Sequence, residues 1–342
     1  MVRKLAPLLL FATVMLGGCD DTPPASMAQI EAAIAENRFM DARDGLLALR
    51  DHDGATPENA ALLAKVMVQL GDGYSAERYL RELEAKQGET PEWMTLRARS
   101  LILQGHAWKA RDVIEQWPGY PTLAEERDLL LVWAAMEEGE NDQAIALIDE
   151  ALRRHPQSAD LHAKAARLAA WEGNWEAADL HIADALAADP DHYEAQLVQG
   201  ESLIAAGDLE GALATYQRVV ETHPDFAIPR ANVVGLQLDL KQLPEAEAAL
   251  NEALAQHPDF PQLRFASARL NAIRGNWPKS REILQSLPSE WKREFPASTL
   301  LEAETEAALG NHAIARTLYE QLAQDPRFAD AANELMGQLP DA

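Results

Sequence analysis

The spacing of prolines, glycines and alanines predicts an all-α protein, a solenoid of about nine helical hairpins with a capping helix at its C-terminal end. Three residue types recur every 34 positions along the 342-residue chain: Pro156, Pro190, Pro224 and Pro258; Gly71, Gly105, Gly139, Gly173, Gly207 and Gly275; and Ala42, Ala76, Ala110, Ala144, Ala178, Ala212 and Ala246. A shared period of this length indicates stacked repeat units and not separate globular domains.

The pattern predicts that each unit forms two helices joined by a tight turn. In the unit that starts at residue 159, Leu161 and Leu168 follow helical spacing, and Gly173 then ends the first helix. A second helix is expected over residues 175–188. It stops before Pro190, because proline lacks an amide proton and restricts the residue that precedes it. Neither helix can bury its apolar face alone, so stability must come from stacking neighbouring hairpins.

These units resemble the tetratricopeptide repeat (TPR), a 34-residue helix-turn-helix with small residues at positions 8 and 20, glycine near 15 and proline at 32. Units are expected to start near residues 23, 57, 91, 125, 159, 193, 227, 261 and 296. The resemblance implies a right-handed TPR superhelix over residues 27–342, closed by a helix at about 329–338. Its concave groove would be lined by the first helix of each unit.

Departures from the pattern carry expectations of their own. The first unit has Asn37 in place of the position-15 glycine, which is typical of a cap. The segment from Pro118 to Pro121 predicts a stiff local turn. Residues 288–295 break the 34-residue frame, so a kink or slackened packing is expected between the eighth and ninth units.

The N-terminus has the features of an export signal. Arg3 and Lys4 precede an apolar run that is shorter than the roughly 20 residues of a membrane-spanning helix. The run ends in Leu-Gly-Gly-Cys19, which resembles the lipobox of bacterial lipoproteins. That resemblance implies a signal peptide over residues 1–18, lipidation of Cys19 and a tether over residues 19–26. The alternative is that Cys19 is an incidental thiol behind an ordinary signal peptide.

The lipobox resemblance implies a location in the bacterial cell envelope, with the protein lipid-anchored and facing the periplasm. Asp20, directly after the cysteine, resembles the signal that retains enterobacterial lipoproteins at the inner membrane. The rule varies among bacterial groups, so the outer membrane remains open.

Charge and cysteine content exclude several classes of function. The chain has 30 basic and 55 acidic residues, a net charge of −25, which becomes −27 without the two basic groups of residues 1–18. Such a charge repels nucleic acid and anionic membrane surfaces, so membrane contact is expected through the N-terminal lipid only. One cysteine permits neither an internal disulfide nor a zinc finger.

No motif points to catalysis, a cofactor, a metal or a small-molecule substrate. The chain lacks HExxH, GxxxxGK[ST] and GxSxG patterns. Asp51 begins a sequence like a calcium loop, but the twelfth position is Leu62 and not glutamate. His155, His223 and His257 precede position-32 prolines and are expected to be linker residues at solvent-facing helix ends.

A stripe of cations is predicted on the concave groove. Position 9 of four consecutive units holds Lys65, Arg99, Trp133 and Arg167, with Trp171 at position 13 of the fifth unit. These residues are candidates for binding an acidic or C-terminal peptide segment, with arginines as carboxylate donors and Trp133 as an apolar anchor. In the alternative interpretation, the cations pair with position-2 acids such as Glu58, Glu92 and Glu126.

The expected function is that of a non-enzymatic, lipid-anchored scaffold or adaptor for other envelope proteins. The resemblance implies roles such as polysaccharide export, pilus or secretion assembly, or regulation of cell-wall enzymes. The alternative is a periplasmic chaperone-like carrier of unfolded or transiting envelope proteins. A scaffold would bind one partner stoichiometrically, whereas a carrier would bind many clients. The hypothesis with the least support is that the solenoid has an enzymatic activity.

Overall fold

The computed structural model describes residues 25–88, 90–116 and 123–340. The predicted signal peptide, Cys19, Asp20 and the segment from Pro118 to Pro121 lie outside these ranges. Within the described ranges, no helix combines the length and the apolar character that crossing a bilayer requires.

Twenty helices make up the regular structure of the described chain. The first ten are α1 (Met27–Ala35), α2 (Phe39–Asp53), α3 (Pro57–Gln69), α4 (Gly73–Gln87), α5 (Pro91–Leu103), α6 (Ala107–Glu115), α7 (Ala124–Glu137), α8 (Asn141–Arg154), α9 (Ala159–Trp171) and α10 (Trp175–Ala188). The second ten are α11 (Tyr193–Ala205), α12 (Leu209–Thr222), α13 (Ala227–Asp239), α14 (Leu243–Gln256), α15 (Pro261–Ile273), α16 (Trp277–Gln285), α17 (Ser289–Glu294), α18 (Ala297–Ala308), α19 (His312–Leu322) and α20 (Ala329–Gly337).

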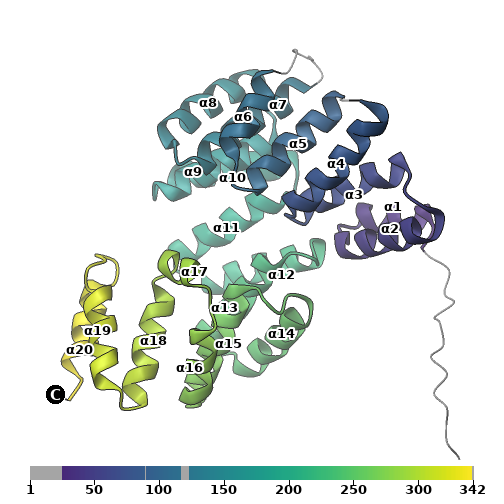
Figure 1. Ribbon diagram of the computed structural model, residues 1–342. Coiled ribbons are helices and arrows are strands. Elements are labelled where there is room, and N and C mark those ends of the chain that lie inside the picture. Colours follow the sequence, from purple (N-terminus) through teal and green to yellow (C-terminus); the bar gives the residue numbers. More distant parts are fainter. Residues whose placement is uncertain (1–24, 89, 117–122, 341–342) are drawn as a thin grey trace, which may run out of the picture.

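Consecutive helices pair into hairpins, and the hairpins stack in chain order along a curved path (Figure 1). The pairs run from α1 with α2 to α15 with α16, and α18 with α19 form the last hairpin. The structure confirms the predicted all-helical solenoid. At its C-terminal end α20 packs on α19, burying Ala332 beside Tyr319 and Leu322.

A left-handed residue joins the two helices of each hairpin. In seven units this residue is glycine, with φ between 71° and 82°: Gly71, Gly105, Gly139, Gly173, Gly207, Gly275 and Gly310. The turn lets the residue after the left-handed one bond back into the last turn of the helix: the amide of Asp72, which follows Gly71, donates to the carbonyl of Met67 at 2.8 Å. Asn37 (φ 54°) and Lys241 (φ 61°) adopt the same conformation in the remaining two units.

The hydrophobic core is a series of local clusters and not one central mass. Leu129, Ile148 and Leu161 bring together α7, α8 and α9 in one cluster, and Val234, Leu250 and Leu263 do the same for α13, α14 and α15. Each cluster joins one hairpin to the next, which is the packing that a repeat solenoid requires.

The frame break after residue 287 is an added short helix, α17. Its Trp291 and the following Phe295 pack against Phe265 of α15, with ring centroids 5.9 and 5.2 Å from that ring. Trp291 packs against the cluster that contains Phe265 and Leu301, whereas Phe295 remains 37% exposed. Direct contact between the first helices α15 and α18 is nevertheless sparser than between α13 and α15, which agrees with the slackened packing expected at this junction.

The first hairpin touches the sixth unit, 185 residues further along the chain. The Asn37 side-chain amide donates to the carbonyl of Thr222 at 3.1 Å, and the Met40 amide donates to the Asp225 carboxylate at 2.7 Å. Phe39 stacks on Phe226 with ring centroids 6.1 Å apart. In Figure 1 the purple first hairpin accordingly lies beside one end of α12. We call this contact the closure.

The closure corrects one expectation from the sequence. His223 was predicted to face solvent at the end of α12, but it is only 9% exposed. Its ring stacks on Phe226 and lies 5.2 Å from the ring of Tyr193. Because this burial disfavours the charged imidazolium, the pKa of His223 is lowered.

Candidate functional site

A pocket of about 460 Å³ lies between the first hairpin and the first helices α3, α5 and α7. We call the row of first helices α3, α5, α7, α9 and α11, which pack side by side, the inner wall. The walls of the pocket are mainly apolar, and its rim carries two of the predicted cations. Ile34, Phe39, Leu62 and Leu96 are among the apolar residues of the walls, and the two cations are Lys65 and Arg99. A concave apolar surface with a few polar groups at its edge is the usual form of a binding site.

Phe39 places this pocket next to the closure. The same ring lines the pocket and stacks on Phe226. The first hairpin therefore has two roles, because it supplies one wall of the pocket and joins the N-terminal end of the solenoid to the sixth unit.

Lys65 and Arg99 are both paired with carboxylates one unit further along. Lys65 Nζ lies 2.6 Å from Glu92 Oε1, with both side chains about half exposed. Arg99 makes two parallel bonds with Glu126, from Nε at 2.7 Å and from Nη2 at 2.9 Å. Both pairs join position 9 of one unit to position 2 of the next, which is the pairing that the alternative interpretation expects.

The two pairs differ in strength. The Arg99–Glu126 pair is bidentate and about three-quarters buried. Burial alone lowers the pKa of Arg99, but hydrogen bonding to Glu126 raises it above its ordinary value, so the guanidinium stays charged. The Lys65–Glu92 pair is exposed and screened by solvent, so it contributes little to folding and exchanges partners readily.

The other predicted residues do not line this pocket. Arg167 pairs with Glu201 at 2.5 Å, and Lys164 pairs with Glu194 at 2.7 Å. The Lys164 ammonium also lies 5.0 Å from the ring centre of Trp133 and covers one face of that ring.

The two tryptophans of the predicted stripe are placed differently. The Trp133 indole N–H donates to Glu137 at 3.1 Å. Trp171, at the end of α9, is 54% exposed. The structure thus brings together Lys65 and Arg99, and it distributes Trp133, Arg167 and Trp171 along the later units.

The apolar walls of the pocket were not predicted from the sequence. Leu62 and Leu96 both stand at position 6 of their units, three residues before the position-9 cations Lys65 and Arg99 and therefore on the same side of the first helix. That shared position is the signal by which they could have been found. Ile34 and Phe39 come from the first hairpin, and nothing in the repeat spacing indicates that they face α3 and α5.

A second pocket, of about 420 Å³, lies beside the closure and is acidic. Asp160, Asp189, Asp191 and Glu194 line it together with His192. His192 Nε2 lies 3.2 Å from Asp160 Oδ1, and this hydrogen bond lowers the pKa of Asp160. The Asp160 carboxylate at this pocket therefore stays ionised at neutral pH.

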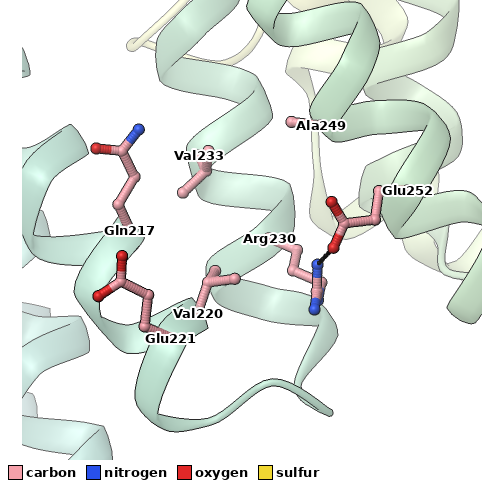
Figure 2. Close-up of a pocket in the computed structure, with 7 residues that line it drawn as sticks. All are labelled: Gln217, Val220, Glu221, Arg230, Val233, Ala249 and Glu252. Atoms are coloured by element: carbon pink, nitrogen blue, oxygen red, sulfur yellow. Dashed lines mark hydrogen bonds and ion pairs between the residues drawn. The ribbon is translucent and has the colours of Figure 1, made fainter.

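A third pocket, of about 370 Å³, lies between α12, α13 and α14 (Figure 2). Val220 and Val233 form apolar parts of its lining. Arg230 crosses from α13 to Glu252 of α14 at 2.9 Å, as the dashed line in Figure 2 marks.

Comparison with known proteins agrees with this architecture. A tetratricopeptide repeat family model matches residues 135–199, 172–232 and 203–270, so this stretch of the chain is similar to tetratricopeptide repeats. No curated protein sequence matches the chain closely enough to count as a relative.

Solved structures share the fold at low sequence identity. The Cut9–Hcn1 hetero-tetramer of the APC/C matches with a TM-score of 0.65 and 13% identity over 86% of this chain, which spans 60% of that chain. PilW, a type IV pilus biogenesis factor, matches with a TM-score of 0.51 and 21% identity, over 62% of this chain and 98% of its own. Pseudomonas aeruginosa pilF matches with a TM-score of 0.50 and 19% identity, over 63% and 97%.

Proposed function

We propose that the protein is a non-enzymatic, lipid-anchored scaffold that binds a segment of another cell-envelope protein in the pocket of the inner wall. The observation that carries this proposal is the apolar pocket between Ile34, Phe39, Leu62 and Leu96, with ion pairs at its rim. Apolar walls suit a buried anchor side chain, and a polar rim orients the rest of a peptide. Tetratricopeptide repeats in general bind protein partners.

The rim indicates what the segment carries. Because the Lys65–Glu92 pair is exposed, a carboxylate of the partner can replace Glu92 at Lys65 at little cost. The Arg99–Glu126 pair is bidentate and more buried, so it stays intact and shapes the pocket. The proposed ligand is therefore an apolar side chain next to an acidic residue or to a free C-terminal carboxylate.

The anchor and the location rest on the N-terminal sequence. Lipidation of Cys19 would hold the acidic body at a membrane without any electrostatic attraction. Asp20 favours the inner membrane, and the outer membrane remains the alternative. Among envelope roles, assembly of a surface structure has the support of one similar fold, the type IV pilus biogenesis factor PilW.

The role of Lys65 can be tested with a synthetic octapeptide library that carries free C-terminal carboxylates. The full-length protein should select peptides with an apolar residue beside an acidic residue or beside the C-terminus. Lys65→Ala should weaken binding of the selected peptides about tenfold, because it removes a charge-assisted hydrogen bond of about 1.4 kcal/mol. Fluorescence anisotropy with labelled peptides measures the change.

Two further variants serve as controls. Lys109→Ala removes an exposed ammonium from α6, a second helix, and should leave affinity unchanged. The swap Lys65→Glu with Glu92→Lys retains an ion pair but moves the ammonium, so it should preserve stability and still lose affinity. Equal peptide affinity in the wild type, Lys65→Ala and the swap would show that Lys65 does not bind the peptide.

A further inference from the structure

We infer that His162, His181 and Asp184 form a binding site for a divalent transition metal ion of the kind that prefers imidazole, such as zinc. His162 lies on α9, and the other two residues lie one turn apart on α10 of the same hairpin. One ligand atom from each lies within 4.8 Å of the others, and this is the one such group of ligand side chains found in the described part of the chain.

The distances fit a single ion held by all three side chains. His162 Nδ1 lies 3.1 Å from His181 Nδ1 and 3.7 Å from Asp184 Oδ2. Two imidazole nitrogens bound to one tetrahedral zinc at 2.0–2.1 Å lie about 3.3 Å apart. The two rings therefore approach each other as they would around an ion.

His162 is held in the orientation that a metal ligand needs. The residue is 8% exposed, and its Nε2 lies 3.1 Å from the carbonyl oxygen of Pro156. Since a carbonyl can only accept, Nε2 carries the proton and donates. Nδ1 then presents a lone pair toward His181 and Asp184, and backbone support of this kind is typical of metal-binding histidines.

The bond to the proline carbonyl does not by itself require histidine. The equivalent residue of the sixth unit is Gln196, whose Nε2 donates to the carbonyl of Pro190 at 2.9 Å. In the seventh unit Arg230 donates to the carbonyl of Pro224 at 3.0 Å. Any side chain with an N–H of suitable reach satisfies this carbonyl, so this bond does not account for an imidazole at residue 162.

The repeat geometry explains why ligands meet in this hairpin. Positions 4 and 26 of a unit contact each other in the later units, as Arg230 with Glu252 at 2.9 Å (Figure 2) and Arg264 with Ser286 at 2.5 Å. The fifth unit fills the same two positions with His162 and Asp184. It then adds His181 at position 23, where the sixth and seventh units have threonine and alanine.

Two nitrogens and one carboxylate oxygen select among metals. Imidazole favours zinc, copper and nickel, whereas calcium and magnesium take oxygen ligands. Asp184 is largely exposed, so the site is open on one side. Three protein ligands leave a coordination position for water or for a group from a partner.

The inference is tested by titrating the full-length protein in detergent with zinc chloride at pH 7.5 in a calorimeter, with magnesium chloride as a parallel titrant. We expect one zinc ion per chain with a micromolar dissociation constant, and no such site for magnesium. His181→Gln should weaken zinc binding more than about tenfold, because it removes a direct ligand where even outer-shell changes cost 10–100-fold.

Matched variants separate this site from the acidic surface. His162→Gln keeps the donor to Pro156 in the manner of Gln196, and it should fold and lose affinity. His52→Gln removes an exposed imidazole 2.6 Å from Asp53 on α2 and should change nothing. Circular dichroism checks folding, and if His162→Gln unfolds, the half-buried His181 decides the question.

Two results would overturn the inference. The first is the absence of a one-ion site, which would leave His181 as a plain hydrogen-bond donor to His162. The second is zinc binding that is the same in the wild type, His181→Gln and His52→Gln. That result would mean that zinc binds carboxylates of the acidic surface.

Discussion

Single residues set the hairpin turns of this protein. The position-15 residue of each described unit is left-handed, and glycine is suited to it because it has no Cβ. Lys241 is the costly exception. A non-glycine residue in this conformation is disfavoured by about 1–2 kcal/mol, and the long side chain of Lys241 is exposed to solvent.

Lys241→Gly should therefore stabilise the protein, by about 1 kcal/mol after allowance for the greater chain entropy of glycine. The expected observation is a higher urea midpoint with an unchanged slope. An unchanged or lower midpoint would mean that the left-handed turn between α13 and α14 carries no strain.

Asn37 occupies the same conformation with a different consequence. Asparagine tolerates left-handed backbone better than most residues, and the Asn37 side chain donates to the carbonyl of Thr222. Its presence thus has two reasons, the turn and the closure. The sequence reveals the first reason through the repeat spacing and gives no sign of the second.

At the scale of helices, small residues set how closely neighbours approach. Gly200 lies in α11 opposite Tyr216 of α12, and a Cβ added there would lie 2.3 Å from Cζ of that ring. Gly235 lies in the next first helix, α13, and a Cβ there would meet nothing within 4 Å. The same residue type serves close packing at one site and has no such role at the other.

Gly200→Ala and Gly235→Ala should therefore shift stability in opposite directions. The first overpacks the buried Tyr216 ring and should cost about 1–3 kcal/mol. The second should gain about 0.5–1 kcal/mol from helix propensity. Thermal unfolding followed by circular dichroism compares them, and shifts of the same sign would contradict the packing between α11 and α12.

Element boundaries were the most predictable part of the structure. Helices end at the glycines and before the prolines because these residues act locally, through φ and the missing amide proton.

Ion pairs across units were only partly predictable. Position 9 meets position 2 of the next unit for Lys65 and Arg99, but the nearest pair of Arg167 is with Glu201.

At the scale of the whole molecule, the closure could not be predicted. It joins residues 185 positions apart, and this contact depends on how the curvature of five consecutive hairpins adds up. No single residue in the sequence indicates that total curvature. The pocket could not be predicted for the same reason, since Ile34 and Phe39 line it only because of how the first hairpin is placed. The His162–His181–Asp184 cluster was missed because its residues are neighbours only in the folded hairpin, at positions 4, 23 and 26.

The claim that the inner wall binds a protein segment is tested most directly by site-specific photo-crosslinking in the cells that produce the protein. A photoreactive residue replaces Leu96 in the pocket, and in a second variant it replaces Leu180, which is 67% exposed on α10. The account predicts one discrete adduct from residue 96 that weakens with Lys65→Ala, and no such adduct from residue 180. Identical adducts from both positions, or none from residue 96, would contradict it.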